Sequence, residues 1–312
     1  MSQFPAAEFP PKADQYGKAT RSTSGMAIAS LILGLSSFFC VVFTGLPAII
    51  LGVIGLSSIS SSNGRVGGSG MAIAGIVTGA MGCLWTLIAI GMLLPAIQQV
   101  RSAARRTVTM NNTRELCLAS LTYESATMRF PSNLSLENPE AGENLSWRVH
   151  ILPFLGRQDL YDRFNLDEPW DSPNNKALIA EIPVQYQHPQ LPELAFTGDT
   201  VYQMPTSKAG SVTPAILVEG ERGATFGSML DGSSNTILIL EVSASAAVPW
   251  TKPQDWQFDP DDPSRELGDA FPGVFVVGMC DGSTHSIQRD IPAETLKPLF
   301  TRSAGDATPA VY

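Results

Sequence analysis

The chain has 312 residues, a formal net charge of −9 and a hydrophobic fraction of 44%, but its charges are unevenly distributed. Residues 1–106 carry a net charge of +5, whereas residues 107–312 carry −14. An acidic domain of about 200 residues repels the phosphates of DNA and RNA, so the composition argues against nucleic-acid binding.

The first 24 residues are polar and contain Pro5, Pro10, Pro11 and Gly17, which is typical of a disordered tail. The basic residues Lys12, Lys18 and Arg21 precede the first apolar run. By the positive-inside rule, their placement predicts that this tail lies in the cytoplasm. A second, short tail is expected at residues 306–312.

Residues 26–94 contain one charged side chain, that of Arg65, and predict an anchor in the lipid bilayer. A turn signal at residues 44–47 (TGLP) and a polar stretch at residues 61–69 divide the apolar region. Within the predicted transmembrane region, residues 25–94, we therefore expect helices at about residues 25–43, 46–60 and 71–94.

Small residues recur in this region, and the hexapeptide SGMAIA occurs twice, at residues 24–29 and 69–74. Gly75 and Gly79 have the four-residue spacing that lets membrane helices approach closely. We expect these glycines to lie at helix contacts.

The number of crossings decides on which side of the membrane the C-terminal part lies. Arg101, Arg105 and Arg106 directly follow the last span, and the positive-inside rule then favours two crossings. The length of the apolar residues 25–60 favours a helical hairpin there and hence three crossings. The residues alone leave both possibilities open.

The last span is predicted to continue beyond the membrane as a stem helix over residues 95–130. Good helix formers extend from about Met71 to Met128, and Pro95 is expected to kink the helix without ending it. Spacings of three and four residues form one apolar stripe from Ile97, Val100, Ala104 and Val108.

Residues 131–305 predict a soluble domain. We expect a helix kinked at Pro153 over residues 145–164, and short helices at residues 174–182 and 296–300. Helix and strand signals both occur, so the expected fold class is α+β.

Three runs of apolar residues, at 215–219, 236–242 and 273–279, predict strands. Asp281 and Gly282 form a turn dipeptide, which predicts a hairpin between the last of these strands and residues 284–288. We expect an antiparallel sheet packed on the stem helix, because that arrangement buries the apolar faces of both.

Several motifs follow one another in a fixed order between residues 93 and 283. They are LLPA at 93–96 (with Pro95), VRSAARR at 100–106, Asn111 and Asn112, SWRVHILPFL at 146–155 (with Trp147), FNLDEPWDSPNN at 164–175 (with Trp170), DGSSNTI at 231–237 (with Asp231, Gly232 and Asn235), VPWTKP at 248–253 (with Trp250) and DGS at 281–283 (with Asp281 and Gly282). In this order they resemble a large bacterial family catalogued as domain of unknown function 1559, which is similar to type IV pilin-like proteins and type II secretion pseudopilins. Residues 24–85 are similar to a membrane family of unknown function, number 4190.

The resemblance implies a multi-pass protein of the cytoplasmic (inner) membrane with an exported C-terminal domain. It also implies a structural or assembly role through contacts with other envelope proteins. The pilin-like processing site is absent, and the apolar region stands in its place. Entry into a pilus-like fibre is therefore not implied.

Three positions depart from the pattern of the family that the chain resembles. Thr109 and His188 stand where members often have cysteines, as expected if the two formed a bridge that this chain has lost. Phe271 stands where the family has the histidine of a His-x9-Asp-Gly motif. We therefore expect no histidine-dependent role at that position.

Candidate chemistry is sparse. The three histidines, His150, His188 and His285, are isolated in the sequence, without a carboxylate or nucleophile at an informative spacing. No Cys-x-x-Cys pair, phosphate loop or nucleophile elbow occurs, so we expect no cofactor and no enzyme activity. Carboxylates that could ligate calcium, or simply form solvated acidic loops, are Asp167, Asp171, Asp259 and Asp261.

Cysteines and tryptophans leave alternatives open. Cys117 and Cys280 could form a bridge in an exported domain or remain buried free thiols. The four tryptophans of the acidic part could be core residues or a platform for a glycan or peptide; they are Trp147, Trp170, Trp250 and Trp256. Two functions therefore remain: a structural or assembly protein of the envelope, and a membrane-tethered receptor for a solute or glycan.

Overall fold

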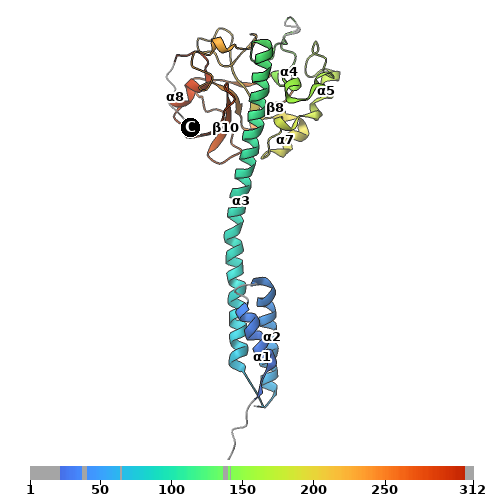
Figure 1. Ribbon diagram of the computed structural model, residues 1–312, viewed down its shortest axis with the longest axis vertical. Helices are drawn as coiled ribbons and strands as arrows, with labels where there is room; N and C mark the ends of the chain where they lie inside the picture. Colours follow the sequence, from blue (N-terminus) through green and yellow to red (C-terminus); the bar gives the residue numbers. More distant parts are fainter. Residues whose placement is uncertain (1–21, 37–40, 64, 136–139, 141, 306–312) are drawn as a thin grey trace, which may run out of the picture. The chain divides into compact units, whose positions relative to one another are not determined.

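The computed structural model describes residues 22–305, apart from residues 37–40, 64, 136–139 and 141 (Figure 1). The chain divides into two compact units, Met1–Gln99 and Val100–Tyr312. Most of the predicted N-terminal tail and the predicted tail at 306–312 lie outside the described residues.

The N-terminal unit contains helices α1 (Gly25–Ser36), α2 (Val41–Ser61) and the first part of α3 (Ser69–Thr127). Two-residue strands, β1 (Ser22–Thr23) and β2 (Val66–Gly67), pair in parallel directly before α1 and α3. Each copy of the repeated SGMAIA therefore begins a helix, and the N-termini of α1 and α3 lie side by side.

The predicted first two spans need correction. The expected turn at residues 44–47 lies inside α2, which continues through Pro47. Gly45 serves helix packing there, because a Cβ at this position would lie 3.2 Å from the Gly79 carbonyl oxygen. The expected first span at 25–43 falls on two elements: α1 covers Gly25–Ser36, residues 37–40 lie outside the described part, and residues 41–43 belong to α2. Within the part of the chain that the structure describes, two helices, α2 and α3, are long and apolar enough to cross a membrane, whereas α1 has 12 residues.

Glycines bring the three helices together. A Cβ on Gly79 would lie 2.9 Å from the Gly45 carbonyl oxygen, and one on Gly75 would collide with Ser30 of α1. A Cβ on Gly52 of α2 would lie 3.1 Å from the Ala72 carbonyl oxygen. The expectation that Gly75 and Gly79 lie at helix contacts is confirmed.

Helix α3 has 59 residues and contains Pro95, so the predicted uninterrupted stem is confirmed. The buried face of its last part differs from the predicted stripe. Ile97, Val100, Ala104 and Val108 are all exposed. The face that packs into the domain consists largely of small and polar residues, Thr109, Thr113, Leu116, Cys117, Ser120 and Tyr123.

Short hydroxyl side chains suit this face for a physical reason. Thr113 Oγ1 donates to the Thr109 carbonyl (2.9 Å) and Ser120 Oγ to the Leu116 carbonyl (2.9 Å), so both are hydrogen-bonded although buried. Small residues also let the sheet approach. A Cβ added to Gly278 would lie 2.9 Å from Thr113 Cγ2 and would collide with the Cys117 sulfur.

The main sheet has four antiparallel strands in the order β11-β10-β7-β4, which confirms the α+β class and the antiparallel sheet on the stem. The predicted strands at 236–242 and 273–279 are β7 (Ile237–Glu241) and β10 (Val274–Met279). The predicted hairpin joins β10 to β11 (Thr284–Gln288). The other edge is β4 (Tyr202–Gln203).

A second, parallel sheet was not predicted. Strands β3 (Asp199–Thr200) and β8 (Val248–Pro249) form a separate antiparallel pair. In the parallel sheet, β5 (Pro205–Ser207) lies between β6 (Leu217–Val218) and β9 (Trp256–Gln257). The expected strand at 215–219 therefore belongs to this sheet. Strands of two or three residues are too short to show an alternating pattern.

The expected kinked helix at 145–164 consists of three short helices. They are α4 (Trp147–His150), a 3-10 helix (Leu152–Leu155) and α5 (Gln158–Tyr161). Gly156 has a left-handed φ of +73°, which ends the 3-10 helix after Pro153 has begun it.

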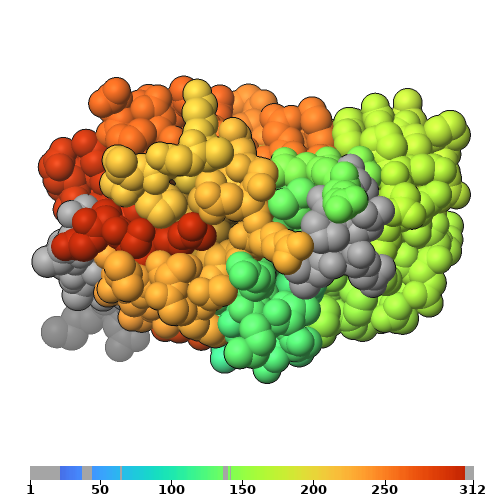
Figure 2. All heavy atoms as spheres, turned by 90° about the horizontal axis from the view of Figure 1, so that it is seen from above, coloured from blue at the N-terminus to red at the C-terminus, as the bar shows by residue number. Residues whose placement is uncertain are grey.

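The remaining helices are also short. The expected helix at 174–182 becomes α6 (Pro173–Lys176) and a 3-10 helix (Ile179–Glu181), and the last becomes α8 (Ala293–Leu296) with Lys297–Phe300. Helix α7 (Pro192–Thr197) and the 3-10 helices Val184–Tyr186, Phe226–Ser228 and Ala244–Ala246 complete the set among the described residues. Seen from above, the short helices around residues 160–190 lie on one side of the domain and the C-terminal segments on the other (Figure 2).

Candidate functional site

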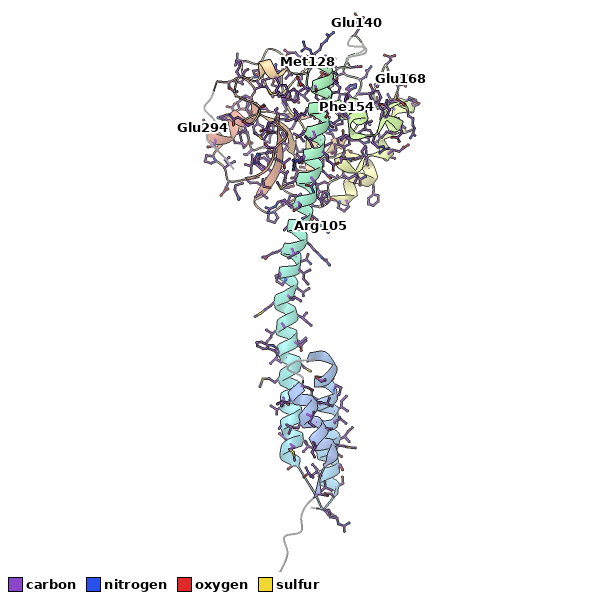
Figure 3. The ribbon with its side chains drawn as sticks, viewed as in Figure 1. Arg105, Met128, Glu140, Phe154, Glu168 and Glu294 are labelled. Carbon is purple, nitrogen blue, oxygen red and sulfur yellow. The ribbon has the colours of Figure 1, made fainter. Side chains whose placement is uncertain are left out.

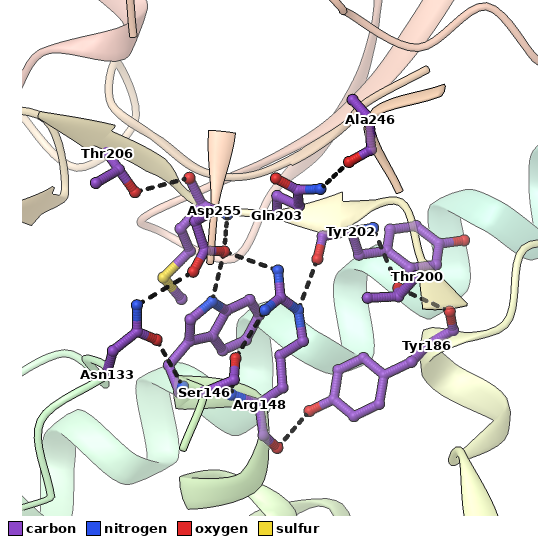
Figure 4. Close-up of polar contacts among 12 residues, drawn as sticks. Asn133, Ser146, Arg148, Tyr186, Thr200, Tyr202, Gln203, Thr206, Ala246 and Asp255 are labelled. Atoms are coloured by element: carbon purple, nitrogen blue, oxygen red, sulfur yellow. Dashed lines mark hydrogen bonds and ion pairs between the residues drawn. The ribbon is translucent and has the colours of Figure 1, made fainter. Parts of the chain in front are cut away.

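Two charged side chains lie fully buried in the domain. Arg148 on α4 and Asp255, just before β9, have no exposed side-chain area, and an Arg148 Nη2 to Asp255 Oδ1 distance of 2.7 Å joins them (Figure 4). Sequence reasoning missed this pair because 107 residues separate its members. The only local signal was the position of Arg148 inside the SWRVH motif.

Both charges are well hydrogen-bonded. Asp255 Oδ1 also accepts from the Trp147 indole (2.9 Å) and the Met204 amide (3.0 Å). Arg148 donates from Nε to the Tyr202 carbonyl (3.0 Å) and from Nη1 to Ser146 Oγ (2.7 Å). A buried ion pair with this many partners is suited to hold α4, β4 and β9 together, and it offers little to a substrate.

A second buried cluster joins α3 to the sheet. His188 Nε2 lies 3.1 Å from Glu241 Oε1 and 3.3 Å from Thr109 Oγ1. Nδ1 of the same ring accepts from the Gln190 amide (3.3 Å), so Nε2, which lies beside Thr109 and Glu241, is the ring nitrogen that carries a proton. The spacing of residues in the sequence could not reveal this partner of His188, because only the fold brings Glu241 of β7 against the ring.

The three departures from the resembled motif meet in this cluster. Besides the contact between Thr109 and His188, the rings of His188 and Phe271 lie 5.5 Å apart. Thr109 and His188, the positions at which cysteines were noted in the family, are thus neighbours. Both side chains of the His188–Glu241 pair are 1% exposed, so a substrate could not reach them without opening the core.

The other two histidines lie elsewhere. His150 is 7% exposed, its Nε2 has no hydrogen-bond partner among the described residues, and burial lowers its pKa to about 4. His285 Nε2 lies 3.1 Å from Ser283 Oγ near the β10–β11 turn.

The candidate calcium ligands are not brought together. Asp167 and Asp171 are exposed, Asp259 lies 3.6 Å from Arg265, and Asp259 Oδ1 accepts from the Asp261 amide (2.9 Å). Over residues 22–305, leaving out those not described, no group of three or more His, Cys, Asp or Glu residues could hold a metal ion. The geometry therefore gives no support to a calcium site.

The tryptophans are mainly core residues. Trp147 and Trp250 are fully buried, Trp256 is 3% exposed and Trp170 is half-buried. The core interpretation is confirmed for the three buried rings, which cannot form the exposed platform considered above. Trp250 stacks on Tyr186 with ring centroids 5.8 Å apart.

The motif around Asp231 fixes the C-terminal segment. Its carboxylate accepts from the amides of Ala304 and Gly305 (2.8 Å each), and the Asn235 amide donates to the Asp231 carbonyl (3.0 Å). Gly232 has a φ of +91°, which a glycine adopts without strain. These motif residues therefore form a structural turn.

The other motif positions also make local contacts. Asn112 donates to the Gln187 carbonyl (3.1 Å), whereas Asn111 is exposed. Asp281 accepts from the Ser283 amide (2.8 Å), and Gly282, with a φ of +86°, completes the hairpin turn.

Cys117 and Cys280 are free thiols in the same hydrophobic core. Burial raises the pKa of both thiols, and the nearby Asp281 carboxylate adds to the effect. The free-thiol alternative therefore holds in this structure.

Comparison with known proteins identifies two families. Residues 98–268, more than half of the chain, match the model of a family described as protein of unknown function (DUF1559). Residues 26–89 match a domain of unknown function (DUF4190). No curated protein and no solved structure matches the chain.

Proposed function

The chain belongs to the family of unknown function DUF1559, and we propose that it is a membrane-anchored envelope protein with a structural or assembly role, acting through pilin-like contacts of its stem with other proteins. The observation that carries this proposal is the surface of α3. All residues from 87 to 100 are exposed on every face of the helix. They include Leu87 (68%), Met92 (74%) and Val100 (69%).

An apolar helix that its own chain leaves bare needs an apolar environment. At a rise of about 1.5 Å per residue, residues 75–94 match the roughly 30 Å hydrocarbon core of a bilayer. Lipid can cover their side chains, and so can the stems of neighbouring subunits. Val100 and Val108 (47% exposed) lie beyond that band, which favours contact with other helices.

We further propose that the domain is exported from the cytoplasm. The parallel pairing of β1 with β2 supports this, because it starts α1 and α3 at the same end of the N-terminal unit. The glycine contacts agree: Gly75 meets Ser30, whereas Gly52 meets Ala72 and Gly45 meets Gly79. Helix α2 thus returns the chain to the side of the membrane on which α1 begins. Helix α3 then crosses to the other side once, and this holds whether or not α1 and α2 cross the membrane fully.

Cysteine labelling tests the proposed side. Ser264 is exposed in the domain, so Ser264→Cys should react with a membrane-impermeant maleimide in intact cells with a permeabilised outer membrane. Cys40 and Cys83 would be replaced by serine, and the buried Cys117 and Cys280 kept. Ala6→Cys in the N-terminal tail is the matched control and should react only after lysis. The reverse pattern would place the domain in the cytoplasm.

Cross-linking tests the assembly role. In native membranes, Met92→Cys should form disulfide-linked dimers under mild oxidation at several times the yield of Val212→Cys. Val212 is 93% exposed on the domain and reports random collisions. Equal yields at the two sites, with no disulfide-linked product of Met92→Cys with any other protein, would mean that lipid alone covers the stem, and the assembly role would then be rejected.

A further inference from the structure

A cavity of about 390 Å³ lies in the domain, beside the C-terminal end of α3. This volume is within the usual range of small-molecule sites. Figure 3 shows Phe154 beside the last turns of α3, where its ring meets that of Tyr123. The lining residues come from α3 and from the segment that holds α4 and α5; they are Tyr123, Thr127, Ser135, His150, Pro153, Phe154, Gln158 and Tyr161.

The lining has no charged side chain, although residues 107–312 carry a net charge of −14. His150 does not change this, because burial holds its pKa at about 4 and the ring is neutral near pH 7. An ion that entered such a site would lose its hydration free energy, and no opposite charge in the lining would compensate for that loss. The ligand that fits it is therefore uncharged.

The cavity lining contains both aromatic rings and polar groups. Tyr123 and Phe154 meet edge to face with centroids 5.6 Å apart, and Tyr161 adds a third ring. Gln158 is exposed, and one N–H of its amide donates to Asp162 Oδ1 (2.6 Å), which leaves its second N–H and its oxygen for a ligand. The Thr127 hydroxyl donates to the Tyr123 carbonyl (2.9 Å), so it can accept a hydrogen bond from a ligand. Few uncharged solutes present both apolar faces and several hydroxyls to such a lining, and sugars do.

His150 gives an independent indication. Its side chain is more than nine-tenths buried, and its Nε2 has no hydrogen-bond partner among the described residues. Buried polar atoms without a partner are rare in folded proteins. A ligand hydroxyl would supply the missing hydrogen bond.

We propose that this cavity binds one or two uncharged sugar rings, with aromatic side chains against their C–H faces and Gln158 and His150 bonding their hydroxyls. The proposal does not depend on the assembly role, because the cavity lies within the domain. It gives the domain a recognition function in addition to its structural one.

Titration of the full chain in lipid nanodiscs tests this, since glycoside detergents would themselves compete. Saturation-transfer NMR with glucose, N-acetylglucosamine and cellobiose should show saturable binding of at least one of them. Glucuronate and glucosamine should bind at least tenfold more weakly than their uncharged counterparts. No saturable binding by any neutral sugar, or binding of uridine alone, would overturn the proposal.

Variants locate the site. Phe154→Ala and Gln158→Leu should each weaken sugar binding about tenfold or more. Gln158 is exposed, so its replacement leaves the fold intact even where Phe154→Ala loosens the segment. Phe196→Ala removes an aromatic side chain that is 89% exposed and outside the cavity lining, and it should bind as the wild type does. Unchanged affinity in Gln158→Leu and in folded Phe154→Ala would exclude this cavity as the site.

Discussion

The two units of this chain bury different groups: the N-terminal unit buries glycine backbone at its helix contacts, and the C-terminal unit buries its large side chains. In residues 22–99, glycine backbones meet at the helix contacts, while large side chains such as Ile32 (63% exposed) and Leu35 (65%) point outward. In residues 100–305, the largest side chains, including Trp147 and Trp250, are fully buried. Each unit is thus adapted to its solvent. Burying an apolar side chain away from water lowers the free energy, whereas burying it away from lipid brings no such gain.

Breaking the buried ion pair should have the largest effect and should act on the domain alone. Arg148→Leu leaves Asp255 charged and without its cation, and we expect a loss of about 3–5 kcal/mol in the domain's free energy of unfolding. Urea denaturation followed by tryptophan fluorescence measures it. Arg163→Ala is the control: it removes an exposed pair with Glu181 and should cost less than about 1 kcal/mol. Equal costs would show that the buried pair has no special role.

Acid should weaken the domain through His150. Burial lowers the pKa of this imidazole from 6.5 to about 4. The unfolded chain therefore binds more protons between these values, so stability present above pH 6.5 is lost as the pH falls toward 4. Between pH 7 and pH 4, the titration of His150 alone should lower the domain's free energy of unfolding by about 3 kcal/mol.

Comparing the wild type with His150→Asn isolates the contribution of this histidine to the loss of stability, because the carboxylates titrate alike in both proteins. Urea unfolding at several pH values should show a smaller loss on acidification in the variant. Parallel pH profiles of wild type and variant would contradict a lowered histidine pKa. In the N-terminal unit, the described residues contain one charged side chain, Arg65, and no such dependence is expected.

Filling a helix contact should disturb the N-terminal unit and leave the domain unchanged. Gly79→Leu places a side chain where the Gly45 carbonyl and Ala48 already lie, and overpacking of this kind costs about 1–3 kcal/mol. Thermal unfolding in nanodiscs, followed by helical circular dichroism, measures the loss. Gly91→Leu on the same helix has open space around it and should change little. A similar loss in both variants would indicate a helix-wide effect.

The smallest expected effect is the maleimide labelling of the two buried thiols of the domain. Because burial raises the pKa of the Cys117 and Cys280 thiols, we expect negligible maleimide labelling of both at pH 8 in the folded protein. Ser264→Cys on the same domain should label within minutes and serves as the internal control. Rapid labelling of the native thiols would show that the contact between α3 and β10 opens readily.

Local sequence patterns predicted the parts of the fold that depend on neighbours in the chain. The apolar region, the continuous α3, strands β7 and β10 and the turn at Asp281 and Gly282 are all of this kind. Each follows from periodicity or from the backbone preference of a few adjacent residues. The same signals failed at Pro47, because a proline that marks a turn in water is tolerated inside an apolar helix.

The tertiary structure alone decided the contacts between distant residues. The pairing of Arg148 with Asp255, the meeting of His188 with Glu241 and the cavity beside α3 join segments that share no local pattern. The tertiary structure also decided which face of α3 is buried. The sheet comes so close to α3 at Gly278 that only small and hydroxyl side chains fit opposite it. A sequence fixes which side chains can be buried, whereas the approach of a second element fixes which ones are.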